Sequence, residues 1–81
     1  MKTKKIQLTP NWIRVCDGTK SVFMERFSGS VGFCVSRTKP VTDADCHILI
    51  QPVTITPPTI VWVKSTRAYK QDTVITVSEM D

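Results

Sequence analysis

The single histidine of the chain, His47, is the first candidate for chemistry. A catalytic triad of nucleophile, histidine and carboxylate requires such a residue. His47 lies at the start of the apolar run Ile48-Leu49-Ile50, a position more typical of a strand-edge or hydrogen-bonded structural histidine than of a base. The sequence contains neither a glycine-rich phosphate loop nor a G-x-S-x-G motif. We therefore expect no enzymatic activity, no catalytic residue and no cofactor.

The cysteines Cys16, Cys34 and Cys46 are the second candidates. Together with His47 they supply three thiols and one imidazole, a ligand set found in structural zinc sites. Those sites use short chelating spacings such as C-x-x-C, and none occurs here. Neighbours in a strand also point to opposite faces, so Cys46 and His47 are poorly placed to share one ion. We expect no metal site and three reduced cysteines that pack as small hydrophobic residues.

Basic residues outnumber acidic ones by 11 to 7, which gives a formal net charge of +4 and favours contact with anionic partners. The lysines and arginines are dispersed except for a cluster at Lys2, Lys4 and Lys5. These three lysines are the candidate partner contacts, carried on a flexible basic arm over residues 1–5. The favoured alternative is a solvated, frayed terminus or an edge strand that its lysines protect from aggregation.

Nucleic acid is a less favoured partner than protein. Modules that bind single strands stack bases on aromatic side chains beside Lys and Arg. Here only Tyr69, between Arg67 and Lys70, stands in a basic and exposed context. Phe23 and Phe27 fall on one face of a predicted strand, which is more typical of a core than of a stacking platform.

The composition favours β-structure. Val, Thr and Ile account for 28 of the 81 residues, whereas Leu and Ala together account for 4. β-Branched residues suit a pleated sheet, and helices are rich in Ala and Leu. We predict one all-β domain over residues 1–81, a small antiparallel β-sandwich or partly open barrel of about 6–8 short strands.

Turn residues divide the chain into eight candidate strands, at 4–8, 12–16, 20–27, 31–36, 46–51, 53–56, 60–66 and 73–78. Asp17-Gly18 predicts a two-residue hairpin that pairs Trp12 with Phe23. Ser28-Gly29-Ser30 predicts a second hairpin, so that three successive strands form a meander. The apolar run 48–50 predicts a central strand, and polar connections are expected at 37–45 and 67–72.

The size of the chain favours self-association. A lone core near 80 residues often supplies only about 3–5 kcal/mol, and small proteins add disulfides, metals or oligomerisation. Because disulfides and metals are not expected, we predict a homo-oligomer, with a trimer among the cyclic options. No signal-peptide pattern or apolar run of about 20 residues is present, so we expect synthesis in a cytoplasm and no membrane contact.

Two tryptophans and a set of turns form a sparse pattern along the chain. It comprises Asn11-Trp12-Ile13-Arg14-Val15, Asp17-Gly18, Gly29-Ser30-Val31, Pro40, His47-Ile48-Leu49 and Val61-Trp62-Val63-Lys64-Ser65. This pattern resembles the small β-sandwich virion proteins of tailed bacteriophages, which decorate heads or build tail and fibre attachments. Trp12 and Trp62 are expected in the core.

The resemblance implies a non-enzymatic structural or accessory protein. Such a protein is made in the host bacterial cytoplasm and joins the virion as a symmetric oligomer docked on another virion protein. The alternative is a small basic β-barrel module that binds nucleic acid or a host protein.

Overall fold

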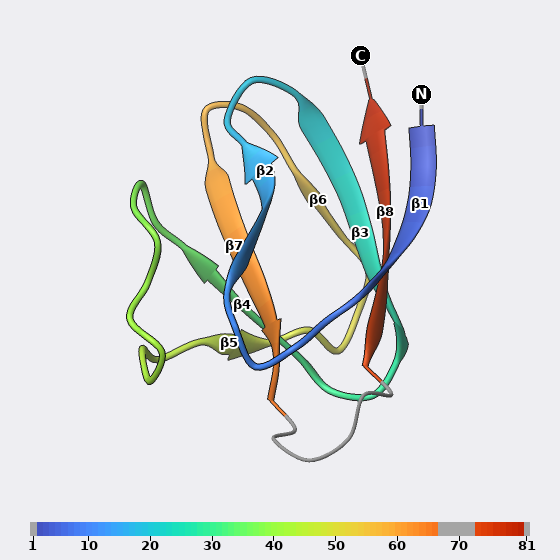
Figure 1. Cartoon of the computed structure of the whole chain (residues 1–81). Coiled ribbons are helices and arrows are strands. Elements are labelled where there is room, and N and C mark those ends of the chain that lie inside the picture. The colour runs from blue at the N-terminus through green and yellow to red at the C-terminus, as the bar shows by residue number, and fades with distance from the viewer. Residues whose placement is uncertain (1, 67–72, 81) are drawn as a thin grey trace.

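The computed structural model describes residues 2–66 and 73–80, in which all regular structure is β-strand (Figure 1). The strands are β1 (Lys2–Gln7), β2 (Ile13–Asp17), β3 (Ser21–Ser28), β4 (Val31–Val35), β5 (His47–Ile48), β6 (Val53–Ile55), β7 (Ile60–Ser65) and β8 (Val74–Met80). Within the described ranges, no helix is long and apolar enough to cross a lipid bilayer.

The strands form two antiparallel sheets of four. Sheet A has the order β1-β8-β3-β6 and sheet B the order β2-β7-β4-β5. β4 pairs with β5, β3 with β6, β2 with β7 and β1 with β8, so the chain is one long antiparallel hairpin rolled into a sandwich. This is the topology of an eight-stranded jelly roll. The predicted all-β sandwich is therefore confirmed.

The core between the sheets follows from the alternation of side chains along each strand. In β7, Val61, Val63 and Ser65 are buried, and the residues between them are only partly buried. Apolar residues of both sheets meet in the same way to form one cluster. Its buried members are Leu8, Cys16, Val22, Met24, Val31, Leu49, Val61, Val63, Ile75 and Val77.

The two short glycine turns cross between the sheets and do not form hairpins. β2 lies in sheet B and β3 in sheet A, and β4 returns to sheet B. The predicted hairpins at Asp17-Gly18 and Ser28-Gly29-Ser30, the meander and the Trp12–Phe23 pair are therefore wrong. Gly18 and Gly29 do have positive φ, of 87° and 75°. A positive φ serves an inter-sheet crossing as well as a hairpin, and the crossing lets consecutive strands face each other across the core.

The apolar run 48–50 is an edge, not the central strand that its composition predicts. β5 contains only two residues and lies at the end of sheet B. Leu49 is buried, but Ile48 and Ile50 are 50% and 77% exposed. The polar connection predicted at 37–45 is present between β4 and β5, whereas the connection predicted at 67–72, with Tyr69, lies outside the described residues.

Candidate interaction surfaces

The lysines at the start of the chain lie on an edge strand. Backbone pairing with β8 places Lys2 opposite Glu79, Lys4 opposite Val77 and Lys5 opposite Thr76, and β1 begins where β8 ends (Figure 1). The prediction of a flexible arm is therefore wrong for residues 2–5, and the alternative prediction of a lysine-bearing edge strand is confirmed. We call β1, with Lys4 and Lys5, the lysine edge.

Strand alternation separates the two lysine side chains of this edge. Lys4 shares a side of sheet A with its partner Val77, which is 2% exposed and belongs to the core. Lys5 points to the outer side, where its Nζ lies 3.9 Å from the ring centroid of Phe27. Both lysines are exposed, so the edge presents a cation on each side of its backbone.

The lysine edge is the longest regular edge in the described sheets. β2 has a register shift between Arg14 and Cys16, β5 has two residues, and β6 has three and follows Pro52. A bulge or a short length hinders the addition of a further strand. β1, with six residues and no register shift, is thus the edge best suited to pair with an extended segment of a partner.

The β5 edge of sheet B presents apolar side chains. A hollow of about 320 Å³ is lined by Phe33 and by residues 47–53, which include the exposed Ile48 and Ile50. The ring of His47 lies 5.2 Å from that of Phe33 at a tilt of 34°. The exposed His47 ring thus lies beside an aromatic neighbour. We call residues 47–50 the isoleucine edge.

The two tryptophans bind the long connection between β4 and β5, which lies on the side of sheet B away from sheet A (Figure 1). Trp12 Nε1 donates to the carbonyl of Val41 at 2.8 Å, and Trp62 Nε1 donates to that of Ser36 at 3.1 Å. Lys64 Nζ adds a third bond, to the carbonyl of Thr42 at 2.7 Å. We call residues 36–46 the covering loop.

The predicted core position holds for Trp12, which is a buried hydrophobic residue with 3% exposure, and needs correction for Trp62, which is only partly buried. Neither tryptophan belongs to the cluster between the sheets. The sequence contained one relevant signal: an indole N–H that is buried usually requires an acceptor, and loop carbonyls are free to supply it. The spacing of the residues does not identify which loop supplies the acceptor.

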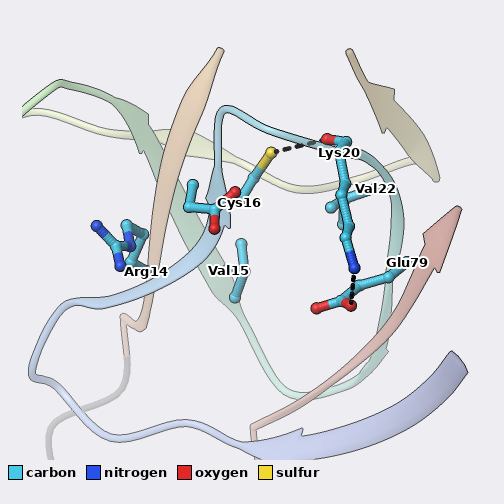
Figure 2. Close-up of a pocket in the computed structure, with 7 residues that line it drawn as sticks. Arg14, Val15, Cys16, Lys20, Val22 and Glu79 are labelled. Atoms are coloured by element: carbon cyan, nitrogen blue, oxygen red, sulfur yellow. Dashed lines mark hydrogen bonds and ion pairs between the residues drawn. The ribbon is translucent and has the colours of Figure 1, made fainter. Parts of the chain in front are cut away.

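A pocket of about 200 Å³ opens between β2 of sheet B and the β3 and β8 strands of sheet A (Figure 2). Lys20 extends toward Glu79, with Nζ and Oε2 4.0 Å apart. Arg14 and Asp17 add one charge of each sign to the lining. The four charged side chains of the lining, two of each sign, thus have a formal sum of zero.

Cys16 forms part of the wall of this pocket but is buried, and backbone oxygens accept the hydrogen of its thiol. Sγ lies 3.2 Å from the carbonyl oxygen of Thr59 and 3.6 Å from that of Lys20. Cys16 is 2% exposed and is free, as are Cys34 and Cys46. Across residues 2–66 and 73–80, no three His, Cys, Asp or Glu side chains are grouped so that they could hold a metal ion.

Asp17 fixes the first inter-sheet turn. Its Oδ1 accepts hydrogen bonds from the Thr19 hydroxyl at 2.6 Å and from the Thr19 N–H at 3.0 Å. These two bonds, and the more distant charge of Arg14, lower the pKa of the Asp17 carboxyl below its ordinary value of 3.8. The ionised carboxylate is therefore the form that closes the turn.

No protein-family model, curated protein or solved structure matches the chain. What the protein does is therefore inferred from its architecture and from its two edges.

Proposed function

We propose that the protein is a non-enzymatic structural or accessory component of a phage particle, which assembles with itself and docks on another virion protein. The observation that carries this proposal is the eight-stranded jelly roll. Viral capsid domains use this architecture repeatedly, together with lectins and cupins. One architecture hosts many unrelated functions, so self-assembly and docking are each assigned to a particular surface of this chain.

The isoleucine edge is the proposed self-assembly surface. Ile48 and Ile50 are large apolar side chains with at least half of their area in solvent, and both line a hollow of about 320 Å³. Removal of such apolar area from water contributes about 25 cal/mol per Å² in favour of association, against the entropy that association costs. A second copy of the chain is the occupant, because a small domain gains stability when its exposed apolar residues pack on another copy.

The lysine edge is the proposed docking surface for the other virion protein. Two β1 strands that paired with each other would bring lysines of the same charge together, which is destabilising. An extended segment with Asp or Glu side chains would pair with the backbone of β1 and place its carboxylates near Lys4 and Lys5. The proposed partner segment is therefore acidic and extended.

Light scattering at low and high salt tests the self-assembly step. We expect a discrete oligomer whose mass does not change with salt, because its interface is apolar. Ile50→Asp should convert it to a monomer. Val41→Asp is the matched control, since Val41 is 68% exposed but lies on the covering loop. A monomeric wild-type protein, or equal effects of the two variants, would contradict the proposed surface.

A peptide of alternating Glu and Thr tests the docking step, with a peptide of alternating Lys and Thr as the opposite-charge probe. We expect binding of the acidic peptide only, and at least about tenfold weaker binding by Lys4→Glu. Lys39→Glu makes the same charge change on the covering loop and should bind normally. Equal loss in both variants would show a general charge effect instead of a docking edge.

The particle supplies the direct test of the virion assignment. The protein should co-purify through a density gradient with phage particles from its source, in a fixed ratio to the major structural protein. Its absence from such particles would overturn the proposal while leaving the solution measurements above intact.

Nucleic-acid binding is the second candidate, and the contact between Lys5 and Phe27 is the observation that favours it. Phe27 is 59% exposed and has a cation over its ring, which resembles one stacking position of a single-strand binding surface. This function predicts affinity for a single-stranded oligonucleotide that falls steeply as salt rises. Phe27→Ala should then weaken the binding, and the absence of any binding at low salt would exclude this candidate.

A further inference from the structure

Backbone register relates two of the three cysteines. In the pairing of β4 with β5, Gly32 lies opposite Ile48 and Phe33 lies opposite His47. One further step in this register places Cys46, the residue before β5, opposite Cys34. The two cysteines thus belong to adjacent backbones, although the covering loop separates them in the sequence.

The type of pair at this position suits a covalent link. The N–H of Leu49 donates to the carbonyl of Val31 at 2.9 Å, which makes Val31 and Leu49 a hydrogen-bonded pair in this register. Hydrogen-bonded and non-hydrogen-bonded pairs alternate, so Cys34 and Cys46 occupy a non-hydrogen-bonded position. There, opposite Cα atoms are about 4.5 Å apart and side chains are closest. Disulfides join Cα atoms about 4.4–6.8 Å apart.

The side chain of Cys46 lies on the face of sheet B that Cys34 shares. Its Sγ is 2.7 Å from the point that a Cβ on Gly32 would occupy. Gly32 and Cys34 are two residues apart on β4, so both present the same face. The missing side chain at Gly32 leaves the space that the thiol now fills, and a rotation about χ1 of Cys46 would be required to turn Sγ toward Cys34.

The remaining cysteine is separated from this pair. Cys16 belongs to the core cluster between the sheets, whereas Cys34 lies opposite Trp62 on the outer face of sheet B. Cys34 and Cys46 are both partly exposed. Solvent and a small oxidant therefore have access to them but not to Cys16.

We propose that Cys34 and Cys46 form an intramolecular disulfide when the protein meets a low-molecular-weight disulfide such as oxidised glutathione. The thiolate of one cysteine attacks a reagent sulfur and releases one glutathione. The thiolate of the other cysteine attacks the mixed disulfide and releases a second glutathione. The protein loses two electrons and two protons, the reagent gains them, and one S–S bond replaces another. The inference rests on the geometry of sheet B and is independent of the proposed function.

The disulfide would fasten both ends of the covering loop. β5 is held in sheet B by a two-residue strand, so a covalent bond to β4 would prevent its separation. The link would also close a short ring that contains the carbonyls bound by Trp12, Trp62 and Lys64. Closing such a ring lowers the entropy of the unfolded chain and thus raises stability.

Incubation of the folded full-length chain with oxidised glutathione tests the proposal. After denaturation and thiol titration, we expect the thiol count per chain to fall from three to one. The mass should fall by about 2 Da, the mass of two thiol hydrogens. A peptide map should join Cys34 to Cys46, and the melting temperature should rise by at least about 5 °C and return on reduction.

Single substitutions separate this outcome from other oxidation products. Cys16→Ser should still form the bond, whereas Cys34→Ser should stop at a glutathione adduct on Cys46. The reciprocal variant Cys46→Ser should stop at an adduct on Cys34. Persistent adducts on the wild-type chain, disulfide-linked dimers, a bond that includes Cys16 or three unreacted thiols would each overturn the proposal.

Discussion

The two sheets contain the same local contact in opposite surroundings. In sheet B, Lys64 Nζ lies 4.9 Å from the ring centroid of Trp12, and that ring is buried beneath the covering loop. In sheet A, Lys5 Nζ lies 3.9 Å from the ring centroid of Phe27, and that ring is 59% exposed. A lysine over an aromatic ring therefore does not by itself distinguish a structural contact from a surface open to partners.

The difference comes from the carbonyl groups of one loop. On the outer face of sheet B, three side-chain donors bind carbonyls of residues 36–46. On the outer face of sheet A, the hydroxyls of Thr3 and Ser78 bond to each other at 2.8 Å, between neighbouring strands of the sheet itself. The outer face of sheet B is thus covered by a loop of the chain itself, whereas sheet A and the sheet edges are open to partners.

Removal of the Trp12 or the Phe27 ring should give the largest difference between the two sheets in the free energy of unfolding that is lost. Trp12→Ala deletes a buried ring and leaves a cavity, so the free energy of unfolding should fall by about 3–5 kcal/mol. Phe27→Ala removes an exposed ring and should cost no more than about 1 kcal/mol. Urea denaturation of both variants measures these losses. Similar losses would refute the distinction between a loop-covered outer face on sheet B and an exposed outer face on sheet A.

The second inter-sheet turn should be the next most sensitive position. Gly29 has a φ of 75°, and a Cβ there would overlap Thr73, which is buried and bonded to the Ser65 hydroxyl at 3.0 Å. Gly29→Ala should destabilise by about 1–3 kcal/mol. Gly18→Ala is the companion variant, since Gly18 has a similar φ but its Cβ would meet the carbonyl oxygen of exposed Pro58. Thermal melts should show Gly29→Ala to be less stable than Gly18→Ala. The reverse order would mean that overlap with Thr73 does not determine the cost of a side chain at position 29.

Substitutions of the two ring-contacting lysines, Lys64 and Lys5, should differ less in their cost to the free energy of unfolding. Lys64→Met removes a hydrogen bond to the covering loop and should cost about 1 kcal/mol. Lys5→Met keeps an apolar contact with Phe27 and should cost about 0.5 kcal/mol or less. Hydrogen exchange gives the sharper measurement, because the Ala44 N–H donates to the Val41 carbonyl within the loop at 3.0 Å. Only Lys64→Met should speed exchange at Ala44, and unchanged exchange would show that the loop holds without this lysine.

The smallest effect should come from the ionisation of Asp17. Its pKa is lowered in the folded protein, so its contribution to stability is fully present above the ordinary value of 3.8 and is lost as pH falls through the lower folded value. A carboxyl titration by NMR should show a midpoint below that value. Asp17→Asn should flatten the dependence of stability on pH in this acidic range, and an unchanged acid transition would place its cause in other carboxyl groups.

The positions of the strands were largely readable from the sequence. The predicted runs 20–27 and 60–66 correspond to β3, Ser21–Ser28, and β7, Ile60–Ser65. Alternation of side chains and turn-forming residues act over a few neighbours, so these signals are visible without the fold. The positive φ of Gly18 and Gly29 belongs to the same local information.

The candidate sites could be predicted from the sequence less well than the strands. The sequence placed Lys4 and Lys5 in one cluster, but pairing of β1 with β8 puts their side chains on opposite sides of sheet A. The loop carbonyls bound by Trp12 and Trp62 lie 29 and 26 residues away from them along the chain. No local pattern identifies partners at such separations.

By itself, the sequence of this protein determined that the chain is β-structured, where most strands lie and where the backbone turns. Only the tertiary structure decided that the turns cross between sheets, that the run 48–50 is an edge and that both tryptophans bind a loop. The reason is that a local conformation such as positive φ is compatible with several pairings. Burial of one shared core between two sheets, which depends on residues far apart in the chain, selects among them.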